Sequence, residues 1–455
     1  MGAIPGDLET DAQPPMTVPL RHFVVGLGFL VAGGVVGALA PFGLLPGRPT
    51  LAHVHLLLVG WVCLTIMGAM TQFVPVWSGV RLHSARLATL QLWLVVVGLL
   101  GFVGALSASA TAWLPVFGSC MLAGFWTFAY NVGRTLRAAR PWDVTERHFA
   151  LAVAFLVVVT AFGVTLAASL AHPGLLDGPV TRLSLRDAHA TLAVFGVVLT
   201  TVVGALSQLV PMFTQSEYHG VDAPLRRVEA VGYPVGVVAL ATGRLFGLPA
   251  VGRVGAVLVA TGLFAFGVVL ARRLLEARVA WTPMLSRYAV AALSLLAWAV
   301  LAVPAWFADP LSPTVLFGPP ELGHLLLFGV VGFTVLGTLY HVVPFIVWVH
   351  RYSDDLGLRA VPAIDDLYDD RLAAADFALT GAGCAALVAA ESLGRPRSLF
   401  AVGGLLAVCG FLVFAANMLL VLRDHGPQSV ATLFVPAFAD DATGDDGAAP
   451  GGRGE

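Results

Sequence analysis

Long apolar stretches alternate with short polar connections along almost the whole chain. A helix needs about 20 apolar residues to cross a bilayer. Twelve stretches meet this requirement: 21–45, 51–77, 86–108, 111–134, 148–171, 187–213, 228–248, 250–271, 286–308, 320–349, 373–393 and 397–422. Only 11% of the residues are charged, against about 25% in soluble domains. The pattern therefore predicts an all-α membrane protein with twelve transmembrane helices.

Three of the predicted helices share one arrangement of glycine and proline. His53 and His189 are each followed by glycine at offsets of 7 and 15 and by proline at an offset of 22. Leu322 begins a third copy with the same offsets, and its histidine, His324, lies two residues further on, where His55 lies in the first copy. The starting positions are 136 and 133 residues apart. We therefore expect three pseudo-repeats of four helices each.

These repeats divide the chain. The expected parts are an N-terminal tail at 1–19, four-helix repeats at 20–140, 141–278 and 279–435, and a disordered acidic tail at 436–455. All 25 basic residues are arginine. A cytoplasmic N-terminus would place 18 of them on the cytoplasmic side and 7 on the other. The excess of positive charge marks the cytoplasmic side, so we expect a cell-membrane protein with both termini in the cytoplasm. The net charge of −2 gives no footprint for nucleic acid.

Histidine inside a membrane helix is costly and indicates a functional site. His53, His55, His189 and His324 occupy equivalent heights in the three related helices. Imidazoles from facing helices suit haem iron and, less specifically, copper. Hydrogen bonding between helices is the structural alternative. Six other histidines, expected to be solvated or interfacial, lie at predicted helix ends or in loops: His22, His83, His148, His219, His350 and His425.

The residues from His53 to Pro75 carry a resemblance. The run His-Val-His, four residues, Gly-Trp, six residues, Gly, six residues and Pro resembles the tenth-helix signature of C-type oxidases. Twelve helices in three groups of four resemble the heme–copper oxidase subunit I superfamily, which includes the nitric oxide reductases. The run is also similar to an element of NnrS-type heme–copper membrane proteins.

The resemblance implies a partial set of cofactor ligands. By offset, His53 and His324 correspond to the two ligands of the family's low-spin haem. Leu322 stands where a ligand of the high-spin haem is expected, and Ala193 stands where a tyrosine is expected. Residues 220–250 contain no histidine that could serve as a copper ligand. The family's oxygen-reducing centre is therefore not recognisable in this chain.

The three copies also suggest how the histidines pair. We predict that the residue at offset two of one copy faces the starting residue of another. His324 then meets His53. By the same rule His55 meets His189, whereas Thr191 meets the leucine that begins the third copy. Two of three related sites would be bis-histidine sites, and the third would have no ligand.

These observations predict an integral membrane b-type haem protein of oxidase subunit I type, with one or two haems. Its role would be electron transfer or a redox role related to nitric oxide or haem, with a quinol, a cytochrome or a cupredoxin as donor and with small membrane subunits as further partners. Whether it is an enzyme stays open; an oxidoreductase is the class that fits. Copper is an alternative metal that we do not predict.

Two alternatives to this role remain. One is an active terminal oxidase or nitric oxide reductase subunit. The other is a histidine-based copper or metal transporter without haem. Ionisable residues inside the predicted helices are few and lie near helix ends, which disfavours a proton-pumping oxidase; they are Glu229, Arg244, Asp376 and Glu391.

Overall fold

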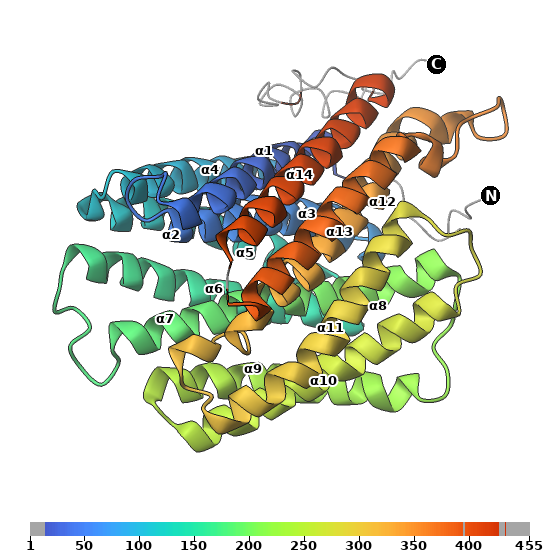
Figure 1. Ribbon diagram of the computed structural model, residues 1–455. Coiled ribbons are helices and arrows are strands. Elements are labelled where there is room, and N and C mark those ends of the chain that lie inside the picture. Colours follow the sequence, from blue (N-terminus) through green and yellow to red (C-terminus); the bar gives the residue numbers. More distant parts are fainter. Residues whose placement is uncertain (1–13, 395, 427–432, 434–455) are drawn as a thin grey trace, which may run out of the picture.

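The computed structural model describes residues 14–394, 396–426 and 433. The predicted tail at 436–455 lies outside the described residues, as do residues 1–13 of the predicted N-terminal tail. The described part of the chain is built from helices and contains no β-strand. Within it, eleven helices are long and apolar enough to cross a membrane. The chain is therefore a multi-pass, all-α membrane protein (Figure 1).

The helices run in chain order from α1 to α14, with short 3₁₀ and π segments between them. The α-helices are α1 (Thr17–Leu39), α2 (Pro49–His55), α3 (Leu64–Ser78), α4 (Ala85–Ser107), α5 (Leu114–Ala138), α6 (Val144–Ala171), α7 (Arg182–Thr191), α8 (Thr200–Thr214), α9 (Asp222–Phe246), α10 (Pro249–Leu275), α11 (Pro283–Ala308), α12 (Phe333–Tyr352), α13 (Asp370–Ser392) and α14 (Arg397–His425).

One predicted span differs from the other eleven. The stretch at 228–248 lies in α9, a helix of 25 residues. It is not among the helices whose composition suits a membrane span. The reason lies in its sequence, because α9 carries Asp222, Arg226, Arg227, Glu229 and Arg244. The helix was predicted at the right place, but its composition alone does not make it a twelfth span.

The three helices predicted to carry the histidines are each interrupted by a π-helical segment. These segments are η3 (Leu56–Cys63), η5 (Leu192–Leu199) and η8 (Leu325–Gly332), and each has 8 residues. A π-helix closes its hydrogen bonds over five residues instead of four and is found mostly at functional sites. Each segment begins directly after the residue at offset two, which is His55, Thr191 or His324. The three interruptions therefore share one register.

We call the three interrupted helices composite helices; they are α2–η3–α3, α7–η5–α8 and η8–α12. Glycines let each composite helix pack closely on the helix that precedes it. The glycine at offset 15 lies against one side chain of that helix in all three places. The distances from a Cβ added at the glycine to the Cβ of that side chain are 2.8 Å for Gly68 and His22, 2.6 Å for Gly204 and His148, and 3.1 Å for Gly337 and Arg287. Any larger residue would push the two helices apart, so the glycine spacing serves close packing.

The side chains that pack on these glycines form a buried polar layer. Nε2 of His148 lies 2.9 Å from Oε1 of Glu229, and Arg287 forms an ion pair with Asp376. His22 is 1% exposed and His148 is 5% exposed. Of the two alternatives that we expected for these histidines, solvated or interfacial, the first is therefore wrong. The two histidines lie near the starts of α1 and α6. Both helices begin several residues before the apolar stretches predicted at 21–45 and 148–171.

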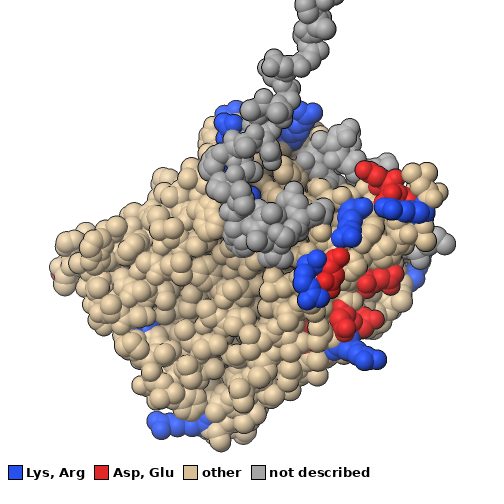
Figure 2. Space-filling model, turned by 90° about the horizontal axis from the view of Figure 1, so that it is seen from above, with Lys and Arg blue, Asp and Glu red and all other residues tan. Residues whose placement is uncertain are grey.

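Charged side chains gather at one end of the bundle (Figure 2). In Figure 1 this is the end at which α8 and α12 finish. The remainder of the visible surface is almost free of charge. This is the distribution expected of a bundle whose middle lies in lipid. The four candidate histidines lie toward the opposite end, where α2 and α7 finish.

Candidate cofactor sites

The structure places His55 and His189 in the wall of one cavity. His53 lies within the range at which a charge on its ring acts on His324. Both arrangements are compatible with the pairs that the repeat predicts. Because His53 and His55 are two residues apart on one helix, both pairs share a single structural element. Whether the histidines bind a cofactor stays a prediction.

Backbone carbonyl groups orient three of the four imidazoles. Nδ1 of His53 donates to the carbonyl of Gly33 at 2.8 Å. Nδ1 of His189 donates to the carbonyl of Val159 at 2.9 Å. Nδ1 of His55 donates to a carbonyl of its own helix at 2.9 Å. A carbonyl oxygen can only accept, so in each ring Nδ1 carries the proton and Nε2 keeps its lone pair. This is the arrangement of a metal-binding histidine.

His324 is oriented by a carboxylate instead. Its Nδ1 lies 2.8 Å from Oε1 of Glu391, and its backbone N–H donates to Oε2 of the same residue at 3.1 Å. The first contact is close but is not aligned as a hydrogen bond. Within the described residues, no hydrogen bond occupies Nε2 of any of the four histidines.

Two glycines provide the space for the imidazoles at the starting positions. A Cβ at Gly37 in α1 would come within 2.3 Å of Nδ1 and Cε1 of His53. A Cβ at Gly163 in α6 would come within 3.1 Å of Cε1 of His189. Each glycine lies one turn after the residue whose carbonyl accepts from the histidine. Gly37 follows Gly33 in α1, and Gly163 follows Val159 in α6. The first and second copies therefore hold these histidines in the same way.

His55 and His189 line one apolar cavity. The cavity has a volume of about 110 Å³, which is below the range of about 300–1,000 Å³ that is common for small-molecule sites. Apart from the two imidazoles, the walls consist almost entirely of aliphatic and aromatic side chains such as Phe102, Met121 and Phe125, together with Gly163. The cavity therefore places one imidazole from each of two helices against apolar walls.

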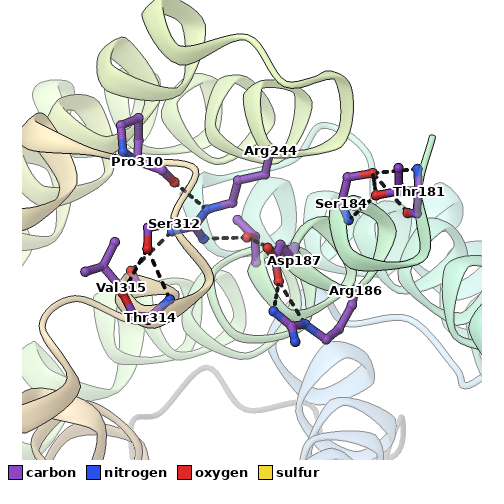
Figure 3. A network of polar contacts seen from close by, with 10 residues as sticks. Thr181, Ser184, Arg186, Asp187, Arg244, Pro310, Ser312, Thr314 and Val315 are labelled. Atoms are coloured by element: carbon purple, nitrogen blue, oxygen red, sulfur yellow. Dashed lines mark hydrogen bonds and ion pairs between the residues drawn. The ribbon is translucent and has the colours of Figure 1, made fainter. Parts of the chain in front are cut away.

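The third related position contains no histidine and is filled by protein side chains. The Nη1 of Arg244 donates to Oγ1 of Thr191 at 2.7 Å, and its Nε donates to the carbonyl of Pro310 at 3.0 Å (Figure 3). The guanidinium also lies 5.5 Å from the ring of Trp306. The side chains of Phe195, Trp298, Trp306 and Phe317 form a packed aromatic cluster beside it.

Arg244 therefore joins the second composite helix to the loop that leads into the third. Leu322 is 8% exposed and Thr191 is 0% exposed, so neither offers a surface to a cofactor. The position at Thr191 is thus sealed by side chains, whereas His55 and His189 line a cavity. Arg244 and Glu391 are buried ionisable residues in apolar stretches, and this is the signal by which the sequence marks them. Their partners could not be inferred from it.

The chemistry of the donors fits haem better than a clustered metal. No group of three or more histidine, cysteine, aspartate or glutamate side chains that could hold a metal ion is found among the described residues. Copper and zinc sites in proteins are usually built from three or four such ligands. A pair of imidazoles with free Nε2 atoms is the type of ligand set that a six-coordinate haem uses.

Comparisons with known proteins add no further constraint. No model of a protein family matches the chain, and no curated protein matches it either. The functional argument therefore depends on the residues and their geometry.

Proposed function

We propose that the chain is an integral membrane haem protein that carries electrons between two bis-histidine haems of b type. His55 and His189 would hold one haem, and His53 and His324 the other. One observation supports the proposal: His55, at offset two, and His189, at offset zero, line the same apolar cavity. Haem bound in this way supplies one-electron redox chemistry and leaves no open position for a substrate.

The chain's own residues would perform three tasks. The carbonyl groups of Gly33 and Val159 hold Nδ1–H and so aim Nε2 of His53 and His189 at the cofactor. The apolar walls around His55 exclude water. The sealed third position keeps the cofactor number at two. An electron donor, such as a quinol, a cytochrome or a cupredoxin, would deliver electrons from outside the chain.

The proposal includes a structural relationship to the heme–copper oxidase subunit I superfamily, in the form of three pseudo-repeats of four helices. The common register of η3, η5 and η8 supports it, as does the glycine contact that recurs three times. It also makes α9 the twelfth crossing. With 25 residues at 1.5 Å each, α9 is about 37 Å long. We further propose that the charged end, with both termini, faces the cytoplasm.

The test is a count of haems per chain in the purified full-length protein, by pyridine extraction and by a reduced-minus-oxidised spectrum. We expect two haems in the wild type. The double variant His55→Ala with His189→Ala should keep one, and so should His53→Ala with His324→Ala. Thr191→Ala with Leu322→Ala, at the sealed position, is the matched control and should keep both.

Other outcomes separate the remaining functions. A wild type without haem but with bound copper would contradict the proposal and favour metal handling. A spectrum that shifts on addition of carbon monoxide would reveal an open coordination position and favour an oxidase or a nitric oxide reductase. Loss of both haems from either double variant, with the protein still folded, would contradict the assigned pairs.

A further inference from the structure

The four histidines differ in what holds their Nδ1 atoms. Three of them donate to neutral carbonyl groups, whereas His324 lies against the carboxylate of Glu391. We infer that Glu391 makes the two sites electronically unequal and gives the His53/His324 site the lower redox potential. This inference depends on the proposed function, because it concerns the haem that these histidines would hold.

Glu391 is fixed in place by two contacts with one residue. It lies in the last turn of α13 and its side chain is 7% exposed. One carboxylate oxygen accepts from the backbone N–H of His324 at 3.1 Å, and the other lies 2.8 Å from Nδ1 of the same residue. The carboxylate therefore holds the backbone of His324 by a hydrogen bond and lies beside its ring. Its place next to Nδ1 makes Glu391 a positioning residue.

A glycine makes room for this carboxylate. A Cβ at Gly323 would lie 3.3 Å from Oε1 of Glu391, which is tighter than ordinary contact. The residue directly before His324 is thus small where the carboxylate approaches. Within the described residues, no other side chain forms an ion pair or a hydrogen bond with Glu391. The carboxylate of Glu391 is therefore directed at His324.

The charge has a predictable effect on the histidine as a ligand. A carboxylate draws the Nδ1 proton toward itself and raises the basicity of the imidazole. A more basic axial ligand donates more electron density to iron and stabilises its oxidised form over its reduced form. A neutral carbonyl does this much less, because a hydrogen bond to an ionised acceptor is roughly twice as strong as one between neutral groups. The His55/His189 site has carbonyl groups on both sides.

Unequal potentials would give the protein a direction. Electrons move from the site of lower potential to the site of higher potential. Because His53 and His55 are two residues apart on one helix, the two sites lie side by side. Glu391 would therefore make the His53/His324 site the entry point for electrons and the His55/His189 site the exit.

The experiment is a redox titration of the full-length protein, followed by absorbance. The variant Glu391→Gln keeps the shape of the side chain and removes its charge. We expect the same number of haems as in the wild type, an upward shift of the lower midpoint potential and no change in the higher one. The matched control is Glu321→Gln. It removes the same charge from an exposed side chain three residues before His324 and should shift neither potential.

The outcomes distinguish this inference from the proposed function. A wild type without haem contradicts the proposed function itself. Two haems whose potentials do not change in Glu391→Gln, or that change equally in Glu321→Gln, contradict the role of Glu391 alone. If Glu391→Gln loses a haem, Glu391→Asp provides the comparison. The shorter aspartate side chain keeps the negative charge but moves it further from Nδ1 of His324. We therefore expect the lower midpoint potential to rise in Glu391→Asp as well. An unchanged potential overturns the inference.

Discussion

The imidazole of His53 lies so close to α1 at Gly37 that a Cβ there would be 2.3 Å from both Nδ1 and Cε1. The ring is trapped between this glycine and the carbonyl of Gly33, to which Nδ1 donates at 2.8 Å. A methyl group at Gly37 would overlap the ring in its present position. The glycine therefore decides whether this imidazole can be aimed at a cofactor.

We accordingly predict that Gly37→Ala removes one of two haems. The methyl group should displace the His53 ring and break its bond to Gly33, while the His55/His189 pair is left intact. The measurement is haem per chain with a thermal unfolding curve. Gly28→Ala in the same helix is the control, because a Cβ there meets nothing within 4 Å. It should keep both haems and gain about 0.5–1 kcal/mol of stability from its better helix propensity. Equal haem content in the two variants would contradict the prediction.

A second prediction concerns the sealed position. Replacing Arg244 by alanine leaves the buried Thr191 hydroxyl and the Pro310 carbonyl without the donor they now have. Each buried acceptor left unpaired costs about 1–3 kcal/mol. We expect a clear fall in the unfolding temperature and no change in the number of haems.

Arg253 provides the control for that variant. It donates to the carbonyl groups of Phe307 and Ala308 at 2.9 and 3.2 Å, but in an exposed setting. Arg253→Ala should therefore cost less than 1 kcal/mol, the range of exposed polar contacts. Loss of a haem from Arg244→Ala, but not from Arg253→Ala, would show that the third position takes part in cofactor binding.

A pairing of the histidines could be proposed from the sequence because their spacing is periodic. Helical spacing places His53 and His55 on opposite sides of one helix, and the repeated offsets of glycine and proline relate the helices to each other. The two pairs stay a prediction, and the cavity shared by His55 and His189 agrees with one of them. The sequence could not say what holds the rings, because the carbonyl groups that orient His53 and His189 belong to any residue type.

Contacts between distant segments were beyond prediction for a physical reason. Glu391 is 67 residues from His324, and Arg244 is 66 residues from Pro310. Nothing periodic connects such residues, since their meeting depends on how whole helices pack. The burial of His22 and His148 was missed in the same way, because apolar stretches define where a span is centred and not how far the helix continues beyond it.

A third prediction concerns the buried ion pair of Arg287 and Asp376. The two side chains are 1% and 0% exposed, and Asp376 also accepts from Tyr340. Asp376→Asn leaves the guanidinium buried without a counter-charge, which costs about 3–5 kcal/mol. The measurement is thermal unfolding in detergent.

The control for this pair is Asp355→Asn. Asp355 pairs with Arg359 in a loop, where the side chains are 27% and 69% exposed. Exposed ion pairs contribute about 0–1 kcal/mol, so this variant should unfold close to the wild type. Similar losses in the two variants would mean that the buried pair is no more important than a surface contact.

The last prediction uses acid to test the start of α6. The carboxylate of Asp143 accepts from the backbone N–H groups of Thr145 at 2.7 Å and Glu146 at 3.0 Å and so caps the helix. Burial opposes ionisation, but these hydrogen bonds and the Glu146 side chain outweigh it, and the pKa of Asp143 lies below its usual value. A carboxyl group with a lowered pKa in the folded state stabilises the protein above its unfolded pKa of about 3.9 and loses that contribution as the pH falls further.

Two variants separate the cap from its charge. Asp143→Ala removes both and should cost about 1 kcal/mol at pH 7. Asp143→Asn keeps an acceptor of similar capping strength but cannot titrate, so it should stay close to the wild type at pH 7 and lose less stability than the wild type as the pH falls below about 4. The measurement is the unfolding temperature of the wild type and the two variants, at pH 7 and at a pH below about 4. If the wild type and Asp143→Asn lose stability in parallel, the charge of Asp143 plays no part in the acid sensitivity of this helix.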